Sequence, residues 1–218
     1  SYSSPYSAYI NMPFIKIMSF SPERFLSYDG NIVETKPIKG TRPVSDDKNI
    51  NKQLMKELSE SYKERAENLM IVDLLRNDLG KNCEYGSVKV KELFSIETFA
   101  NVHHLVSTIQ GKIASDNDIY KLIRDCFPGG SITGAPKIRA MQIINELELD
   151  NRNVYCGSIG YISFSGTTDL NIAIRTVMAT KDKLYFWGGG GIVYDSEVES
   201  EYKETFDKIK PLLNLLKS

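Results

Sequence analysis

Two pairs of glutamates stand out, because the members of each pair are three residues apart. The pairs are Glu64 with Glu67 and Glu201 with Glu204. On a helix this spacing places both carboxylates of a pair on one face. Converging carboxylates repel one another unless a cation neutralises them, and oxygen ligands without a His or Cys cluster suit Mg²⁺. On spacing alone, however, a solvated acidic helix face explains each pair better than a metal site does.

Lys39 is a candidate nucleophile in the segment Pro37-Ile38-Lys39-Gly40-Thr41. The stiff proline before it and the flexible glycine after it could hold the amine close to a ligand. A lysine becomes nucleophilic when burial or neighbouring cations lower its pKa. An exposed turn lysine is the plainer interpretation, because most lysines remain solvated and protonated.

Two glycine-rich segments could approach an anionic ligand. Residues 128–137 lead into a predicted helix start, where free N–H groups favour an anion, although the segment is not a P-loop. The run Gly188–Gly191 also permits close approach, but a sharp strand exit explains it equally well. His103 and His104 flank a predicted strand start, so at most one of them faces a given site.

The elements that must position these residues begin with a strand meander. Strands are expected at Tyr6–Ile10, Ile15–Phe20 and Phe25–Tyr28. Helical periodicity then extends from Asp47 to Leu69 and carries the first glutamate pair. The short apolar run Met70–Leu75 that follows is typical of a strand.

Strands and helices continue along the rest of the chain. Strands are expected near residues 86–90, 105–113, 154–165, 169–180 and 184–187, with helices at 117–126 and 136–148. Ser131 or Thr133 is the expected cap of the 136–148 helix. Ser196, with Glu199, has the capping-box pattern for the final helix. Runs of strands without regular βαβ alternation predict an α+β fold with largely antiparallel sheets.

The composition favours small-molecule chemistry in one globular domain. The 218 residues include 27 basic and 28 acidic side chains, so no polybasic surface for nucleic acid or anionic lipid is expected. No apolar run reaches the roughly 18 residues of a membrane span, and no secretory leader is recognised, so a cytoplasmic location is expected. Cys83, Cys126 and Cys156 lack zinc or redox spacing and are expected to be buried or half-buried fillers.

Several motifs occur together in a fixed order. They lie at residues 21–25, 37–41, 66–78, 104–107, 134–137, 155–161, 174–176, 190–196 and 201–208. In this order they resemble the chorismate-binding enzymes, which include component I of aminodeoxychorismate synthase and of anthranilate synthase, and the isochorismate and salicylate synthases. The resemblance implies antiparallel sheets packed as a sandwich with helices on the outside. It also implies that residues 1–218 are the C-terminal part of a chorismate-binding catalytic domain, without the N-terminal part of the fold.

The resemblance assigns roles to the residues singled out above. It implies that Glu67 and Glu204 bind Mg²⁺ with support from Glu64 and Glu201, which favours the metal interpretation over a solvated helix face. Chorismate is a dianion, which Arg and Lys beside Mg²⁺ suit. The implied substrate-binding residues are Gly40, Thr41, His104, Ser131, Tyr155, Arg175, Gly190, Gly191 and Lys208.

Lys39 decides between members of the family. Aminodeoxychorismate synthases of this type carry Pro-Ile-Lys-Gly-Thr, whereas anthranilate and isochorismate enzymes usually have alanine at the lysine position. The resemblance therefore implies a Mg-dependent transferase in which Glu23 protonates the departing C4 hydroxyl while Lys39 attacks C2. Ammonia from a glutamine amidotransferase subunit then gives 4-amino-4-deoxychorismate for para-aminobenzoate and folate synthesis. Anthranilate synthase component I and a non-catalytic chorismate-binding module remain the alternatives.

Overall fold

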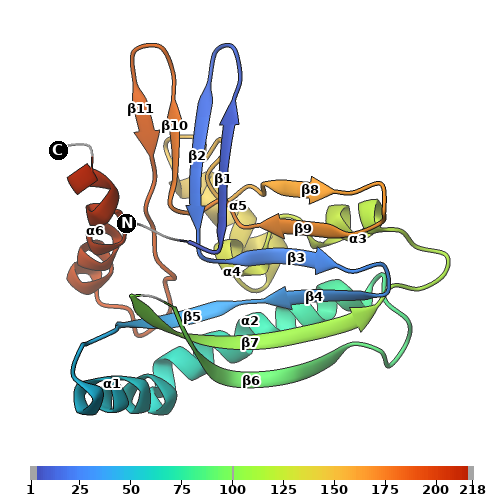
Figure 1. Ribbon diagram of the computed structural model, residues 1–218, viewed down its shortest axis with the longest axis horizontal. Coiled ribbons are helices and arrows are strands. Elements are labelled where there is room, and N and C mark those ends of the chain that lie inside the picture. The colour runs from blue at the N-terminus through green and yellow to red at the C-terminus, as the bar shows by residue number, and fades with distance from the viewer. Residues whose placement is uncertain (1–3, 100, 216–218) are drawn as a thin grey trace.

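Two antiparallel sheets form the framework of the computed structural model, which describes residues 4–99 and 101–215 (Figure 1). The first sheet has the order β1-β2-β10-β11, and the second has the order β5-β7-β4-β3-β9-β8, with β6 also paired to β7. The strands of the first sheet are β1 (Tyr6–Asn11), β2 (Lys16–Ser21), β10 (Thr176–Ala179) and β11 (Leu184–Phe186). Those of the second are β3 (Arg24–Tyr28), β4 (Ile32–Lys36), β5 (Ile38–Pro43), β6 (Lys89–Thr98), β7 (Val102–Lys112), β8 (Gly160–Ile162) and β9 (Thr168–Asn171).

The helices lie outside these sheets (Figure 1). They are α1 (Lys48–Glu60), α2 (Tyr62–Gly80), α3 (Ile119–Cys126), α4 (Gly130–Thr133), α5 (Lys137–Leu147) and α6 (Val198–Leu215). Both α1 and α2 pack against β5 and β7, whereas α6 lies at the edge of the molecule (Figure 1). The predicted α+β class with largely antiparallel sheets and outer helices is confirmed.

The two sheets meet where the chain passes from β2 to β3. Asn171, at the end of β9, donates through Nδ2 to the Tyr6 carbonyl oxygen at 2.9 Å and to Ser19 Oγ at 3.4 Å. β9 pairs with β3 in the second sheet, and β10 pairs with β2 in the first. Glu23 therefore lies at the junction of the two sheets, where segments distant in sequence meet.

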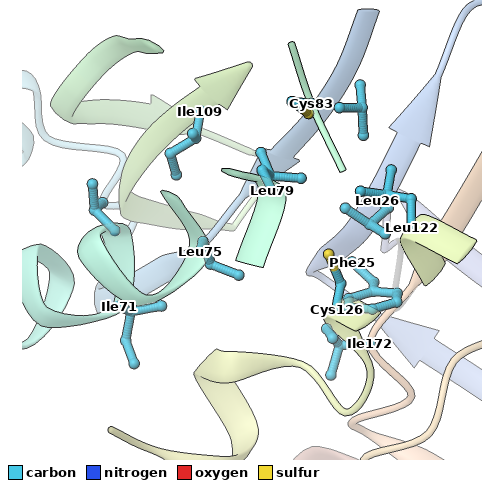
Figure 2. Close-up of a cluster of buried hydrophobic side chains, with 12 residues drawn as sticks. Phe25, Leu26, Ile71, Leu75, Leu79, Cys83, Ile109, Leu122, Cys126 and Ile172 are labelled. Atoms are coloured by element: carbon cyan, nitrogen blue, oxygen red, sulfur yellow. The ribbon is translucent and has the colours of Figure 1, made fainter. Parts of the chain in front are cut away.

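The core fixes α2 against the second sheet (Figure 2). Ile71, Leu75 and Leu79 of α2 are buried in a cluster with Phe25 of β3 and Ile109 of β7. Burial of such side chains contributes roughly 1.5–3 kcal/mol each, so this cluster holds the helix firmly in place. Because α2 is held along its length, the glutamates near its start have a defined position relative to β5.

Two predictions for residues 47–75 are wrong. The expected single helix is two helices, because Ser61 ends α1 in an extended conformation and caps α2, accepting from the Glu64 N–H. Residues 70–75, expected to form a strand, lie inside α2. Ile71 and Leu75 are buried at helical spacing while Met70 is exposed, so the apolar run covers one side of a helix.

The expected caps and strand lengths in the second half also need correction. α5 begins after Pro136 without a side-chain cap, and Thr133 donates within its own short helix to the Gly129 carbonyl oxygen. Ser196 does not cap α6; its hydroxyl donates to Glu201 at 2.7 Å. The strand expected at 154–165 is confined to β8, and the segment 169–180 is divided into β9 and β10.

Two further sequence expectations concern the interior and the membrane. Cys83, Cys126 and Cys156 are free and buried, as predicted. Among the helices of residues 4–99 and 101–215, none combines the length and apolarity needed to cross a membrane.

Candidate active site

A bulge in β5 sets the position of Lys39. The pairing of β5 with β7 shifts register between Lys39 and Thr41, and Gly40 between them has φ +76°. A Cβ at Gly40 would lie 2.7 Å from Leu58 Cδ1 and 2.9 Å from Glu64 Cδ. Glycine is needed here for both its conformation and its size, and the bulge brings the backbone next to Lys39 close to the start of α2.

Glu23 is a buried carboxyl beside Lys39. Only 6% of its surface is exposed, and it lines a small cavity together with Ser131. Burial raises the pKa of Glu23, while the Ser131 hydroxyl, the charge of Lys39, the Ile38 backbone and the charge of Lys208 oppose the shift. The candidate acid Glu23 therefore lies within electrostatic range of the candidate nucleophile Lys39.

His104 lies behind the bulge and faces Thr41. Its Nδ1 is 2.9 Å from Thr41 Oγ1. Burial, assisted by the charge of Arg175, lowers the pKa of His104 to about 4. His104 is consequently a neutral polar group at neutral pH. His103 points elsewhere, to Thr98 and Asn51, as expected for adjacent strand residues.

Tyr155 and Lys208 border the glycine run from two sides. The Tyr155 ring stacks on Trp187 with centroids 6.1 Å apart and planes 4° apart. A Cβ at Gly189 would lie 2.9 Å from the Tyr155 hydroxyl oxygen, so this position excludes a side chain. Lys208 Nζ donates to the Gly189 carbonyl oxygen at 3.1 Å and is 2.6 Å from Glu204 Oε1. The expected substrate-binding residues Tyr155 and Lys208 thus meet at one segment.

The two glutamate pairs approach each other across Lys63. Its Nζ is 4.0 Å from Glu67 Oε1 on α2 and 3.4 Å from Glu201 Oε1 on α6. The hydrogen bond from Ser196, together with Lys63, lowers the pKa of Glu201. Burial raises the pKa of Glu67 despite the opposing charge of Lys39. The carboxylates therefore form a negative region, and the Lys63 ammonium already neutralises part of its charge.

Gly190 and Gly191 lie between the glutamates and Lys39. A Cβ at Gly191 would be 3.6 Å from Lys39 Nζ and 3.7 Å from Glu67 Oε2. A Cβ at Gly190 would be 3.1 Å from Glu201 Oε2 and 4.0 Å from Glu204 Oε1. The glycine run therefore brings backbone into contact with charged side chains, which a plain strand exit would not require.

The donor set has the chemistry that Mg²⁺ prefers, because it consists of carboxylate oxygens. Within the part of the chain that the structure describes, no three His, Cys, Asp or Glu residues are grouped closely enough to hold a metal. Each carboxylate instead faces a basic side chain: Glu67 and Glu201 face Lys63, Glu204 faces Lys208, and Glu64 lies 3.9 Å from Arg42. The pairs thus converge on a cation-attracting region that lysine and arginine share.

Comparison with known families identifies the family of this chain. A family model described as chorismate binding enzyme matches residues 1–214. The chain belongs to the chorismate binding enzyme family. The family resemblance predicted from the ordered sequence motifs is therefore confirmed.

The relatives of this chain include aminodeoxychorismate synthases and anthranilate synthases. Aminodeoxychorismate synthase component 1 of Salmonella typhimurium is 53% identical over 99% of this chain and 47% of its own length. The protein of the same name from Bacillus subtilis is 45% identical over 94% of this chain and 44% of its own length. Anthranilate synthase component 1 1 of Haloarcula marismortui is 43% identical over 97% of this chain and 43% of its own length. The chain spans about half the length of these relatives.

Solved structures share the fold of this chorismate binding enzyme. Anthranilate synthase component I from Streptococcus pneumoniae superimposes with a TM-score of 0.85 at 39% identity, over 95% of this chain and 46% of that one. The menaquinone-specific isochorismate synthase of Escherichia coli has a TM-score of 0.83 at 24% identity, over 94% of this chain and 46% of that one, and shows the fold alone.

Three residues of the site were missed by sequence reasoning. Lys63 was detectable in principle, because it precedes Glu67 by one helical turn, the spacing of an ion pair. Ser196 was noticed only as a helix cap, and its bond to Glu201 depends on the path of the loop before α6. Trp187 had no local signal, because its stacking on Tyr155 joins segments distant in sequence.

Proposed function

We propose that this chain carries the catalytic residues of an aminodeoxychorismate synthase component 1. It converts chorismate and ammonia to 4-amino-4-deoxychorismate, as a cytoplasmic transferase in para-aminobenzoate and folate synthesis. A glutamine amidotransferase subunit supplies the ammonia, in keeping with the name component 1 of the relatives. The observation that carries the proposal is the buried Glu23 carboxyl, whose pKa is raised by burial and partly lowered again by the charge of Lys39 and by the backbone of Ile38, the residue before Lys39.

Glu23 has the environment that a general acid needs. Burial raises its pKa, which favours the protonated form that can donate a proton to a leaving hydroxyl. Ser131 and the Ile38 N–H orient the carboxyl. Lys39, one residue further along β5, has its amine at Gly191 and so lies on the side of the glycine run that faces Glu67.

The reaction proceeds in two substitutions. The Lys39 amine forms a bond to C2 of chorismate, the ring double bond shifts, and the C4–O bond breaks as Glu23 donates the proton with which the hydroxyl leaves as water. Ammonia then forms a bond to C4, the double bond shifts back, and the bond between C2 and Lys39 breaks; the proton released by ammonia restores Glu23. The lysine thus divides one difficult substitution into two easier ones.

The carboxylates of α2 and α6 are the proposed metal site. Glu67 and Glu204 would hold Mg²⁺, with Glu64 and Glu201 supporting them. The bound cation would supply positive charge for a carboxylate of chorismate. The other groups proposed to bind the dianion are Gly40, Thr41, His104, Ser131, Tyr155, Arg175, Gly190, Gly191 and Lys208. Of these, Tyr155, Gly190, Gly191 and Lys208 border the glycine run, and Ser131 contacts Glu23.

Product identification tests the proposal. The protein is incubated with chorismate, Mg²⁺ and an ammonium salt, and the product is identified by mass and by conversion to para-aminobenzoate on addition of a lyase. We expect 4-amino-4-deoxychorismate, and omission of Mg²⁺ should abolish its formation. Direct release of anthranilate would support the alternative function instead, which the Haloarcula relative and the Streptococcus structure favour. Chorismate binding without any product would support a non-catalytic module.

A second experiment tests the nucleophile. Without ammonia, the intact-protein mass should increase by a chorismate-derived adduct that is absent from Lys39→Ala. Lys36→Ala is the matched control, because Lys36 ends β4, which β7 separates from β5 in the sheet, and its ammonium pairs with Glu97 at 2.9 Å. An adduct that persists in Lys39→Ala would exclude Lys39 as the nucleophile.

A further inference from the structure

A buried ion pair lies outside the residues that the proposed reaction uses. Asp78 of α2 is 1% exposed and accepts from two lysines. Lys81 Nζ is 3.0 Å away with half of its side chain exposed, whereas Lys137 Nζ is 2.5 Å away with 13% exposed. Lys137 also donates to the Cys126 carbonyl oxygen at 2.8 Å. The two lysines share one carboxylate, but only Lys137 joins it to a second segment.

Lys137 joins the two ends of the segment 127–136. Cys126 is the last residue of α3 and Lys137 is the first residue of α5, so the bond from Lys137 to the Cys126 carbonyl joins the two ends of the segment. The bond to Asp78 fixes the same ends to α2, which the core holds in place. One ammonium therefore determines where the segment begins and ends.

The segment itself is wedged between α2 and the end of β9. A Cβ at Gly129 would lie 2.6 Å from Ile172 Cδ1, and a Cβ at Gly130 would lie 2.7 Å from Leu74 Cδ2. Ser131 follows these glycines and lines the same small cavity as Glu23, and its interaction with that carboxyl lowers the pKa of Glu23. A small displacement of the ends of this segment would therefore move the Ser131 hydroxyl, which orients Glu23.

We propose that Lys137 and Asp78 form a positioning pair that holds Ser131 beside Glu23 in the cavity that both residues line. Neither residue is among those proposed to bind chorismate or react with it, and the pair acts through the segment 127–136. Its consequence for catalysis rests on the function proposed above. Lys81, which shares Asp78 but does not reach the segment, has no such role.

A double-mutant cycle between Lys137→Met and Ser131→Ala tests the pair. The first readout is kcat, which Lys137→Met should lower by about tenfold or more with little change in KM. The loss should stay within the roughly 10²–10⁴-fold rate enhancement that general acid catalysis supplies. The second is the pKa of Glu23, measured by carboxyl-carbon NMR in the full chain. Because the Ser131 bond lowers that pKa, each single variant should raise it. Lys39 from β5 and Lys208 from α6 also face Glu23 and are unchanged throughout.

The cycle has a definite outcome. If Lys137 acts through Ser131, adding Lys137→Met to Ser131→Ala changes neither kcat nor the pKa of Glu23 further; fully additive effects would overturn the proposal. Lys81→Met should match the unsubstituted protein in both readouts. If Lys137→Met does not fold, the double variant Asp78→Asn/Lys137→Met, which removes both buried charges, takes the place of Lys137→Met in the cycle. Absence of product from the unsubstituted protein would refute the proposed function. The pKa of Glu23 measured by NMR would still test whether Lys137 and Asp78 position Ser131.

Discussion

At the scale of single residues, Lys63 lies between the glutamates proposed to bind Mg²⁺. Its ammonium lies within 4.0 Å of both Glu67 and Glu201 and is half exposed. We expect Lys63→Met to strengthen Mg²⁺ binding severalfold, because exposed ion pairs are worth up to about 1 kcal/mol. Isothermal titration with Mg²⁺ measures the change. Lys56→Met, which removes a pair with Glu60 on α1, is the control and should bind Mg²⁺ unchanged. Equal or weaker binding by Lys63→Met would show that Lys63 supports the metal rather than competing with it.

His104 makes stability depend on pH. Its pKa falls from the ordinary 6.5 to about 4 on folding, so between these values the unfolded chain binds the proton and the folded chain does not. The protein should therefore lose stability as the pH falls from about 6.5 to 4, by about 3 kcal/mol in total. His104→Gln should lose less over this range in denaturant unfolding at pH 7 and 4.5. An identical pH dependence in both proteins would contradict the neutral, buried state of His104.

At the scale of elements, the bulge in β5 requires glycine. Gly40→Ala places a methyl group at φ +76° against Leu58 and should lower the free energy of unfolding by about 2–4 kcal/mol. Gly80→Ala is the matched control, because a Cβ at the exposed end of α2 meets nothing within 4 Å. That substitution should stabilise the protein by about 0.5–1 kcal/mol. Chemical denaturation of the two variants gives the comparison, and equal effects would show that the bulge is not constrained.

The elements also show how far the sequence could predict this protein. The amphipathic stripe of α6 and the turn residues between strands are local signals, and they predicted the class of the fold. The apolar run from Met70 to Leu75 is short enough to match a strand or one side of a helix, and the core contacts that make it helical come from β3 and β7. Sequence spacing likewise offered the glutamate pairs, but their meeting across Lys63 requires α6 to fold back onto α2.

At the scale of the whole molecule, the three cysteines report on global unfolding. Burial raises the pKa of Cys83 and Cys156 to about 11 and that of Cys126 to about 12. The reactive thiolate is therefore scarce and enclosed in the folded chain. A thiol reagent at pH 8 should label these cysteines only slowly in buffer and rapidly in denaturant, as counted by mass spectrometry. Fast labelling of one cysteine in buffer would reveal local opening around it.

The place of α6 at the edge of the molecule links ligand binding to order. Among the described side chains of α6, only Glu201 and Leu212 are buried. The helix is held by Leu212 and by the polar contacts of Glu201 and Lys208. Detachment of this helix alone would separate Glu201 and Glu204 from Glu67 while Glu23 and Lys39 stayed on the core. A ligand that contacts both α6 and the core binds only when α6 is docked. At a ligand concentration of 100 times the dissociation constant, such binding would stabilise the docked state of α6 by about 2.7 kcal/mol. The substrate would thus complete the part of the fold that binds it.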